Sequence, residues 1–506
     1  MPFGALHLSE TVGSNIGTMK AKVLHIYFLL LVCCYSCIKT EQEPKIFDLL
    51  SYYQPEGFKD SLLVGTLPVL EDRNAPNGKK INLYVAVTPA TKRDSLLEPI
   101  FIVDGGPGVA ASNQSYFYTE IDQSYRRYHD IVYVDVRGTG RSNPLHCPEI
   151  QTKSSPQEYF EHPFPVNELE ACIKRYRDSV DFNFYQSKYM VDDLEEVRKW
   201  LGYNKINLMA ISFGGKVSLM FMDRYPNSIN RVVLHAPDAP HIEYVSKRGR
   251  YSQRALDELF KLCDSDSLCS SNYPNLRNEF KGVMKRLQDS IIKQKIEANG
   301  IDQEIELRWP PIAAKFANML YSDDQYIEIP YLVHEAYLEN YNPILEAMNI
   351  TNTETDFFYA DGLWFANICA EDLPVATENY DQSETESFLG DYVYATRKYA
   401  CDHWPVQPAD TSDLTAVVSE IPTLLISGHF DPALPPETGK DIVKNLANGQ
   451  HIIIPYMAHM LGNLSNIDCY DRYVLAYFDG IEDQLDMDCF SEMKPGPFKL
   501  PPPEDK

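Results

Sequence analysis

The chain has 506 residues, which suits a large single-domain enzyme with insertions, or two domains. Its composition, 44% hydrophobic and 23% charged residues, is that of a globular protein with enough apolar material for a large core. The formal net charge of −26 argues against nucleic acid as a partner, because binding to phosphates requires a basic surface.

The amino-terminal segment predicts export. A short basic stretch begins at Met19, the expected start, and precedes an apolar run with the length of a signal-peptide core, too short to span a bilayer. We place the signal region at residues 1–37. Cys37 follows the small residue Ser36, as the acylated cysteine of a bacterial lipoprotein does, whereas more apolar residues precede Cys34. The mature protein is expected to be a periplasmic or cell-envelope lipoprotein anchored in the membrane by this lipid. The alternative is a secreted protein with an ordinary signal and incidental cysteines.

Eight further cysteines indicate disulfides, since an even number in an exported chain suggests four bonds. They fall in sequential couples, which favours pairing between neighbours. No couple has C-x-x-C spacing and no histidine cluster accompanies them, so neither a metal site nor another cofactor is expected. These cysteines are Cys147, Cys172, Cys263, Cys269, Cys369, Cys401, Cys469 and Cys489.

The predicted strands alternate with helices. Ser61–Leu70 and Ile81–Ala90 flank a Gly/Pro/Asn turn and suggest a hairpin at a sheet edge. Six later runs are short and rich in Val, Ile and Leu, as in strands buried on both faces of a parallel sheet. These runs are Glu98–Gly108, His129–Ser142, Ile206–Ser212, Ile229–Pro240, Ile421–Pro435 and Gly449–His459. Helical patterns between them predict an α/β fold with functional residues at the carboxyl ends of the strands.

One long interval, from about Ile242 to Val418, lacks strands of this type and is dominated by helical patterns. We interpret it as a mostly helical cap, inserted between two core strands, that covers the active site and selects substrates. The expected organisation is a signal region (1–37), a first part of the core (38–241), the cap (242–418) and a carboxyl-terminal part of the core (419–506).

The tetrapeptide Ser212-Phe213-Gly214-Gly215 follows one of the predicted strands and precedes a helix. A serine on a sharp turn between a strand and a helix forms the nucleophile elbow of α/β-hydrolases, usually written G-x-S-x-G. Ala210 stands here in place of the first glycine. We interpret the stretch as a small-residue variant of a working elbow.

A serine nucleophile requires a histidine base and an acid that orients the histidine. Ser212, Asp431 and His459 follow three predicted strands in the chain order serine, acid, histidine that this fold uses. Asp238 and His429 are weaker rivals for the acid and the base. These positions predict a serine hydrolase, and a serine at the elbow argues against an epoxide hydrolase or a dehalogenase.

The tetrahedral intermediate of acyl transfer requires backbone donors for its oxyanion. The N–H of Phe213 is one candidate. The loop Asp104–Gly108 (DGGPG) follows a strand earlier in the chain, and its glycines leave the backbone amides open to a substrate. It is expected to supply the second donor.

The motifs GGPG, DVRGTGRS, SFGGK, SGHFDPALPP and AHM resemble the proline iminopeptidase and tripeptidyl aminopeptidase branch of the α/β-hydrolase fold. The likeness covers nearly all of the mature chain, and the cysteine couples and the segment from about Asp413 to Cys489 resemble the exported tripeptidyl-aminopeptidase-like members. It implies cleavage at the amino terminus of peptides, with Ser212 as nucleophile, His459 as base, Asp431 as orienting acid and Gly106 as second oxyanion donor. Ala210 and Asp104 depart from the family pattern, which usually has Gly and often His at these positions.

An aminopeptidase must bind a free ammonium group, and a carboxylate in the cap is the simplest partner for it. Glu371 and Asp372 follow Cys369, and exported relatives carry a similar acid after that cysteine. The expected substrates are therefore peptides with a free amino terminus. Two alternatives stay open: a carboxylesterase of the same fold, and a non-catalytic binding domain, which would lack one of the three catalytic residues.

Overall fold

The computed structural model describes residues 45–506, except 299, 352–357, 379, 382–384, 482–486 and 503–506. The expected signal region, with Met19 and Cys37, lies outside the described residues. The described residues belong to one compact unit, Lys45–Lys506.

A nine-stranded sheet forms the centre of the unit, in the order β1-β2-β3-β5-β4-β6-β7-β10-β11. The antiparallel pair β2 and β3 is the hairpin expected at one side. The other strands after β3 in this order, β5, β4, β6, β7, β10 and β11, run parallel to one another, as predicted. The carboxyl ends of β4, β6, β10 and β11 therefore meet at one edge of the sheet, where the candidate residues follow them. The bounds are β1 (Ser51–Tyr53), β2 (Leu62–Leu70), β3 (Lys80–Thr88), β4 (Ile100–Val103), β5 (Ile131–Val134), β6 (Ile206–Ile211), β7 (Ile229–His235), β10 (Thr423–Gly428) and β11 (Gly449–Ile454).

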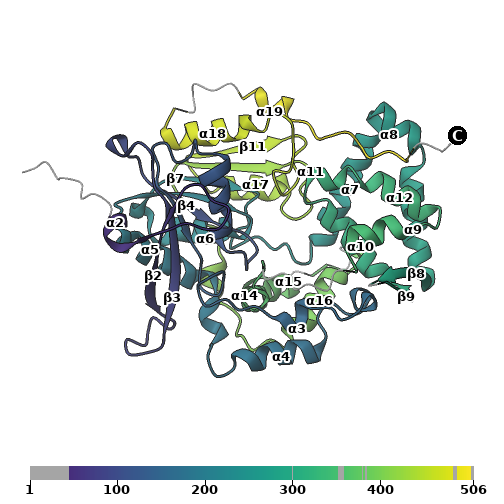
Figure 1. Cartoon of the computed structure of the whole chain (residues 1–506), viewed down its shortest axis with the longest axis horizontal. Coiled ribbons are helices and arrows are strands. Elements are labelled where there is room, and N and C mark those ends of the chain that lie inside the picture. The colour runs from purple at the N-terminus through teal and green to yellow at the C-terminus, as the bar shows by residue number, and fades with distance from the viewer. Residues whose placement is uncertain are drawn as a thin grey trace, which may run out of the picture. The chain divides into compact units, whose positions relative to one another are not determined.

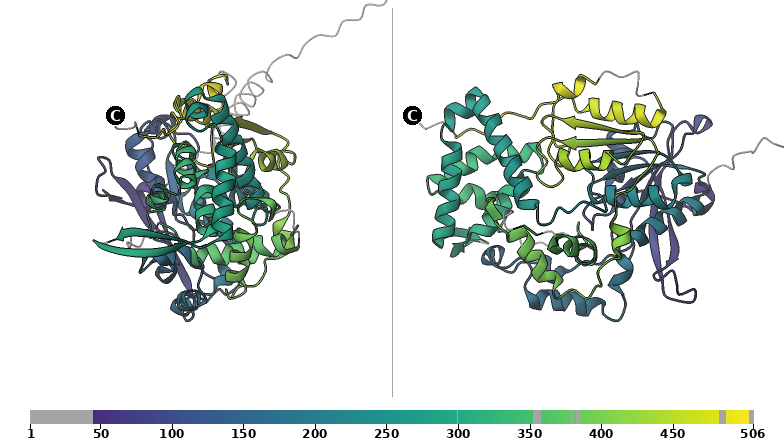
Figure 2. Two further views of the ribbon diagram at one scale, coloured as in Figure 1. Left: turned by 90° about the vertical axis from the view of Figure 1, so that its right-hand side faces the viewer. Right: turned by 180° about the vertical axis from the view of Figure 1, so that it is seen from behind.

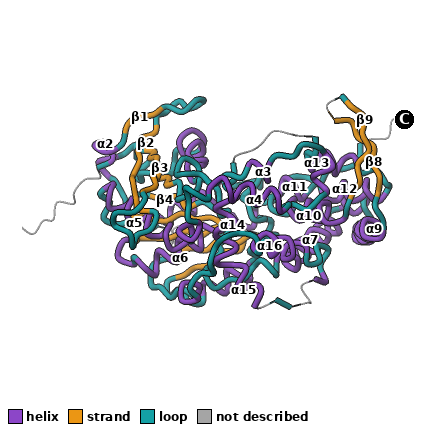
Figure 3. The backbone as a smooth tube through the Cα atoms, turned by 90° about the horizontal axis from the view of Figure 1, so that it is seen from below, coloured by secondary structure: helices purple, strands orange, loops and turns teal. Residues whose placement is uncertain are grey.

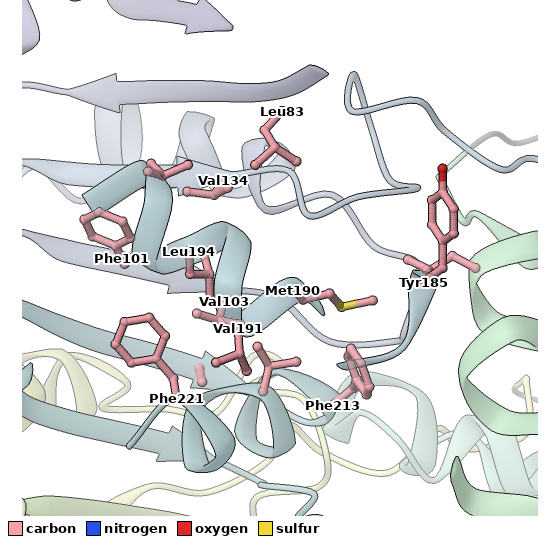
Figure 4. Packing of buried hydrophobic residues seen from close by; sticks show 14 of the residues in the cluster. Leu83, Phe101, Val103, Val134, Tyr185, Met190, Val191, Leu194, Phe213 and Phe221 are labelled. Carbon is pink, nitrogen blue, oxygen red and sulfur yellow. The ribbon is translucent and has the colours of Figure 1, made fainter. Parts of the chain in front are cut away.

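Both faces of the inner parallel strands β4, β5 and β10 are buried, which explains their apolar sequences. In β4, Phe101 and Val103 pack into one hydrophobic cluster, and Ile100 and Ile102 into another on the opposite face. The first cluster includes apolar residues of α5 (Ser187–Leu201) and α6 (Phe213–Arg224), as Figure 4 shows. The second includes α18 (Asp468–Asp479), drawn in yellow in Figure 1. Helix α17 (Pro436–Val443) contacts β10 and β11.

The predicted cap consists of two groups of helices with different cores. The first group has its own hydrophobic cluster and comprises α7 (Arg248–Ser265), α8 (Ser267–Asn272), α9 (Leu276–Asp289), α10 (Trp309–Met319), α11 (Asp323–Tyr326), α12 (Ile329–Tyr337) and α13 (Asn342–Met348). The second comprises α14 (Asp361–Asn367), the π-helix η7 (Ile368–Asp372), α15 (Leu373–Glu378) and α16 (Tyr392–Cys401). Residues of this second group pack into the same cluster as the sheet.

Two features of this region differ from the expectation. A hairpin of β8 (Ile292–Ala298) and β9 (Ile301–Leu307) interrupts the helices, and Figure 3 shows it in orange, apart from the main sheet. Short helices from within the range assigned to the core, α3 (Pro148–Gln151) and α4 (Val166–Tyr176), lie beside α14 to α16 (Figure 2). Phe164, just before α4, contacts Trp364 and Phe365 of α14.

Four disulfides join the eight cysteines in the sequential pairs that their spacing favours. They tie helices that are near one another in the chain; one of them bonds η7 to α16. The bonds are Cys147–Cys172, Cys263–Cys269, Cys369–Cys401 and Cys469–Cys489. Within the part of the chain that the structure describes, none of the helices combines the length and apolar character needed to cross a membrane.

Candidate active site

Ser212 lies on the turn between β6 and α6 with φ 55° and ψ −123°. A non-glycine residue at this positive φ is strained, and such strain is typical of a nucleophile elbow. Two hydrogen bonds hold the turn: the Ser212 N–H donates to the carbonyl of His235, and the Asp238 N–H donates to the carbonyl of Ser212, each at 3.0 Å. The end of β7 therefore fixes the backbone of the serine.

Gly214 and Gly215 allow α6 to begin close to the sheet. A Cβ on Gly214 would lie 2.1 Å from the carbonyl oxygen of Val103, and one on Gly215 would lie 2.7 Å from Cβ of Pro237. Ala210, on β6, is 2% exposed, so its methyl group fits where the usual motif has glycine.

His459 and Asp431 form a buried pair at the ends of the neighbouring strands β11 and β10. His459 Nδ1 lies 2.8 Å from Asp431 Oδ2, and Asp431 Oδ1 accepts hydrogen bonds from the N–H groups of Ala433 (2.7 Å) and Leu434 (2.9 Å). Burial acts to raise the pKa of Asp431, but His459 and the two N–H groups outweigh it and leave that pKa below its usual value. An ionised Asp431 requires the proton of the ring on Nδ1, so Nε2 is left as the basic atom.

A second histidine, His235, contacts the backbone of His459. His235 Nε2 lies 2.9 Å from the carbonyl oxygen of His459, and His235 Nδ1 lies 3.2 Å from the Tyr470 hydroxyl. Because a carbonyl only accepts, Nε2 of His235 carries the hydrogen. Burial lowers the pKa of His235 to about 4, so its ring is neutral and Nδ1 accepts from the tyrosine.

Ser212 and His459 line one cavity of about 430 Å³, within the usual size range of ligand sites. Among the described residues no hydrogen bond joins Ser212 Oγ to the His459 ring; contacts of this kind are often long in unliganded enzymes. The cavity is mostly apolar and aromatic, with a few charged groups. Its other lining residues are Asp104, Gly105, Gly106, Val109, Gln114, Ile211, Phe213, Asp238, Tyr244, Tyr321, Phe358, Tyr359, Trp364, Arg397, Ala433, Leu434 and Met460.

The two candidate oxyanion donors lie at this cavity. Phe213 is the first residue of α6, where a helix leaves its N–H groups without intrahelical partners. Gly106 has φ 118°, a conformation that favours glycine. Neither N–H donates to another group among the described residues. Asp104 braces the loop by accepting from the Gly105 N–H (2.7 Å) and from Gln114 Nε2 (3.0 Å).

Glu371 and Asp372, the candidate ligands of a substrate amine, do not line the cavity. They lie behind it and face the buried ammonium of Lys216, which is 3.8 Å from Glu371 and 2.5 Å from Asp372. Glu371 also accepts from the N–H and the hydroxyl of Ser187, both at 2.7 Å. Asp238 is the third carboxylate at Lys216 (3.2 Å), and it does line the cavity.

This cluster holds three carboxylates against one ammonium, all of them at most 3% or 4% exposed. Burial raises the pKa of Asp238 to about 7, against the opposing effect of Lys216. Burial likewise raises the pKa of Glu371. The cluster therefore has an excess of negative charge that reaches the cavity through Asp238.

The sequence indicated Asp238 only as a rival for the orienting acid, and Lys216 was not predicted as part of the site. A signal was present, because Lys216 is the one charged residue in the first two turns of a helix that must pack against the sheet. The other rival, His429, points away from the site: its Nε2 lies 3.3 Å from Glu258, and its side chain is 42% exposed.

Two family models match the chain. One, described as the alpha/beta hydrolase fold, matches residues 98–270, and one described as a TAP-like protein matches residues 386–489. The chain is 23% identical over 481 residues to a tripeptidyl aminopeptidase of Streptomyces lividans, covering 86% of this chain and 84% of that protein. It is 22% identical over 452 residues to the serine protease Hip1 of Mycobacterium tuberculosis, covering 83% and 85%. It is 21% identical over 321 residues to the proline iminopeptidase of Aeromonas sobria, covering 60% and 66%.

Proposed function

Since this chain is a serine hydrolase of the α/β-hydrolase fold with a TAP-like carboxyl-terminal segment, we propose that it is an exported exopeptidase that cleaves peptides near a free amino terminus. The observation that carries the proposal is the cavity itself. It brings Ser212 and the His459–Asp431 pair together with a carboxylate, Asp238, that belongs to a cluster with excess negative charge.

In the proposed first step, Ser212 Oγ attacks the carbonyl carbon of the scissile bond while His459 Nε2 takes the hydroxyl proton. Asp431 holds the ring in this tautomer and stabilises the imidazolium that forms. The developing oxyanion receives hydrogen bonds from the Phe213 and Gly106 N–H groups, and the free state of both donors supports these roles.

The tetrahedral intermediate then collapses. The C–N bond breaks, and the leaving amine takes the proton from His459, which leaves an acyl group on Ser212. Water attacks this ester with His459 again as base, and a second collapse releases the amino-terminal fragment and restores the serine hydroxyl.

Recognition of the free amine is assigned to Asp238, supported by Glu371 and Asp372 through Lys216. An ammonium group next to Asp238 offsets part of the excess negative charge of the cluster and favours the ionised form of Asp238. Glu371 and Asp372 act indirectly, because their carboxylate oxygens contact Lys216 and not the cavity. The amino-terminal specificity of the proposed enzyme thus comes from the core as well as from the cap.

Export is supported by four disulfides, since such bonds form and persist in oxidising compartments. Lipidation at Cys37 is part of the same proposal and rests on the sequence alone.

The test uses purified protein and a matched panel of chromogenic substrates. Pro-, Ala- and Ala-Ala-Pro-nitroanilides with free amines are assayed beside their N-acetylated forms and a short-chain nitrophenyl ester. We expect hydrolysis of at least one free-amine anilide, strong loss of activity on acetylation, and loss of all activity in Ser212→Ala. Turnover of the ester with no anilide cleaved would instead identify a carboxylesterase.

A further inference from the structure

Arg397 lines the cavity with a cationic side chain that the proposed reaction does not use. It lies on α16, which the Cys369–Cys401 disulfide ties to η7, the element that carries Glu371 and Asp372. The guanidinium is therefore held in a fixed relation to the acidic cluster of the site.

Within the described part of the chain, the Arg397 guanidinium has no carboxylate as an ion-pair partner. Among the described residues, none of its N–H groups donates a hydrogen bond; its Nε has no accessible surface and no partner. The guanidinium lies over the ring of Trp364, whose centroid is 5.4 Å from Cζ. A stacked aromatic ring orients a guanidinium but does not neutralise it.

This isolation is unusual in so acidic a chain, which has 72 acidic against 46 basic residues. Arg137 and Arg248, which are buried, have hydrogen-bond partners, whereas Arg397 is half-buried and faces the cavity. Arg137 forms a two-pronged pair with Asp193, with both N–O distances 2.7 Å, and Arg248 donates to the Ser252 hydroxyl at 3.0 Å. Desolvation lowers the pKa of Arg397, but a guanidinium stays protonated in proteins, so an anion bound in the cavity would stabilise this charge.

We propose that Arg397 binds a carboxylate of the substrate, so that the cavity selects peptides carrying a negative charge in addition to the free amine. Tyr244 and Tyr359 line the same cavity and are close enough to interact electrostatically with the guanidinium. Their hydroxyls offer further donors to the same carboxylate. The cavity is then bipolar, with the carboxylate of Asp238 for the ammonium of the ligand and Arg397 for its anion.

This proposal deepens the proposed exopeptidase function and rests on it. A planar guanidinium suits a carboxylate because two parallel N–H groups can meet its two oxygens. Two groups of a peptide supply this chemistry. One is the side chain of Asp or Glu among the amino-terminal residues, and the other is the carboxyl terminus of a short peptide.

The test is calorimetric binding to the Ser212→Ala protein, which holds peptides without turning them over. One set of peptides differs only by Glu against Gln at each of the first three positions, and a second only by a free carboxyl terminus against an amide. We expect one set to show a preference for the acid of about 10- to 100-fold in Kd. The set that does so identifies the source of the carboxylate.

The preference should disappear in Arg397→Gln and persist in part in Arg397→Lys, each combined with Ser212→Ala. Arg308→Gln is the matched control, because Arg308 is a cap arginine with a 44% exposed side chain and only long ion pairs, to Glu161 (3.7 Å) and Glu306 (3.8 Å). It should keep the preference of the parent. If acid and neutral peptides bind alike to the parent, or if Arg397→Gln weakens both equally, Arg397 is a structural residue and the inference is wrong.

Failure of the proposed function gives a different result. In that case no peptide binds and no anilide is cleaved, whatever its charge, although nitrophenyl esters are hydrolysed. Peptide binding that depends on the free amine but not on the carboxylate overturns the role of Arg397 and leaves the exopeptidase proposal standing.

Discussion

Single side chains in the cavity are oriented before any substrate arrives. The Asp431 carboxylate is bound by the His459 ring and by two backbone N–H groups, so the fold sets both the charge of Asp431 and the tautomer of His459. The ring of Tyr321 packs edge-on against His459 at 5.0 Å and further limits rotation of the imidazole. Such preorganisation lowers the cost of reaching the transition state.

Asp431→Asn tests this orientation. The amide keeps the shape of the carboxylate but favours the wrong tautomer of His459, so we expect kcat to fall by about four orders of magnitude with little change in KM. Circular dichroism checks the fold. His429→Gln is the control, since His429 faces Glu258 outside the cavity, and it should keep nearly full activity. Equal activity of Asp431→Asn and the wild type would remove Asp431 from the mechanism.

Asp238 predicts a pH dependence that separates amine recognition from chemistry. Its pKa of about 7 means that it becomes neutral as the pH falls below 7 and then no longer attracts an ammonium group. Above roughly pH 8 the α-amino group of the peptide loses its own proton. The ratio of kcat/KM for a free-amine anilide to that for a neutral nitrophenyl ester should therefore peak between these values.

Asp238→Asn should lower this peak by about tenfold and flatten the profile. The ester serves as an internal control, because it uses the same serine and histidine without an ammonium group. A variant that keeps the wild-type ratio across the whole range would show that the amine binds elsewhere.

The sequence predicted the positions that depend on chain order, but among the cap residues it did not indicate Arg397 and did not show which group Glu371 faces. Ser212, Asp431 and His459 each follow a strand, and neighbouring parallel strands bring such positions together. Arg397 and Glu371 lie on cap helices, whose packing has no comparable rule. Glu371 therefore looked like a direct ligand, although its carboxylate faces Lys216 and Ser187.

At the scale of elements, the contact of α6 with the sheet decides whether the elbow forms. Gly214→Ala would stabilise an exposed helix by about 1 kcal/mol, but here the new methyl group meets the Val103 carbonyl. We expect the clash to prevail and to lower the free energy of unfolding by about 1–3 kcal/mol, with loss of activity. Urea denaturation measures the change.

Ala210→Gly is the comparison for this variant, because it restores the usual motif without adding an atom. It should cost only about 0.5–1 kcal/mol and leave kcat within a few-fold of the wild type. A stable and active Gly214→Ala protein would mean that α6 does not need this close approach.

The parallel strands were predictable because burial on both faces leaves a continuous apolar run, as in the four residues of β4. The hairpin of β8 and β9 was not. Every second residue of its strands is charged and most of the others are apolar, and its side chains are mostly exposed or half-buried. The apolar residues of the preceding helix recur with helical spacing, and Ile292 continues that spacing although it is the first residue of β8. The sequence therefore does not show where the helix ends and the strand begins.

At the scale of the whole described unit, the last segment of the chain connects the core to the first group of cap helices. It runs from α19 (Cys489–Glu492) across to α8, as Figure 1 shows in yellow. The Lys499 N–H donates to the carbonyl of Ile327 (3.2 Å), and the Tyr273 hydroxyl donates to the carbonyl of Lys499 (2.7 Å). Phe498 packs against the cluster of this group.

Deletion of residues 497–506 should loosen the first group of cap helices while the sheet stays folded. We expect limited proteolysis to cut within residues 255–350 several-fold faster and KM to rise more than kcat falls. Lys499→Ala is the control, because it removes the exposed ion pair with Glu328 and the contact of the ammonium group with the Tyr331 ring, but keeps the backbone bonds. An unchanged cleavage rate in the deletion protein would mean that this segment does not stabilise the cap.

The central claim is that Ser212 is the nucleophile and that His459 activates it. Labelling with a fluorophosphonate, followed by mass spectrometry of the digested protein, tests it most directly, because the reagent reacts with an activated serine regardless of substrate preference. The account predicts one phosphonyl group per chain, located on Ser212, absent in Ser212→Ala and formed orders of magnitude more slowly in His459→Ala. A label on another residue, or equal labelling of wild type and Ser212→Ala, would contradict it.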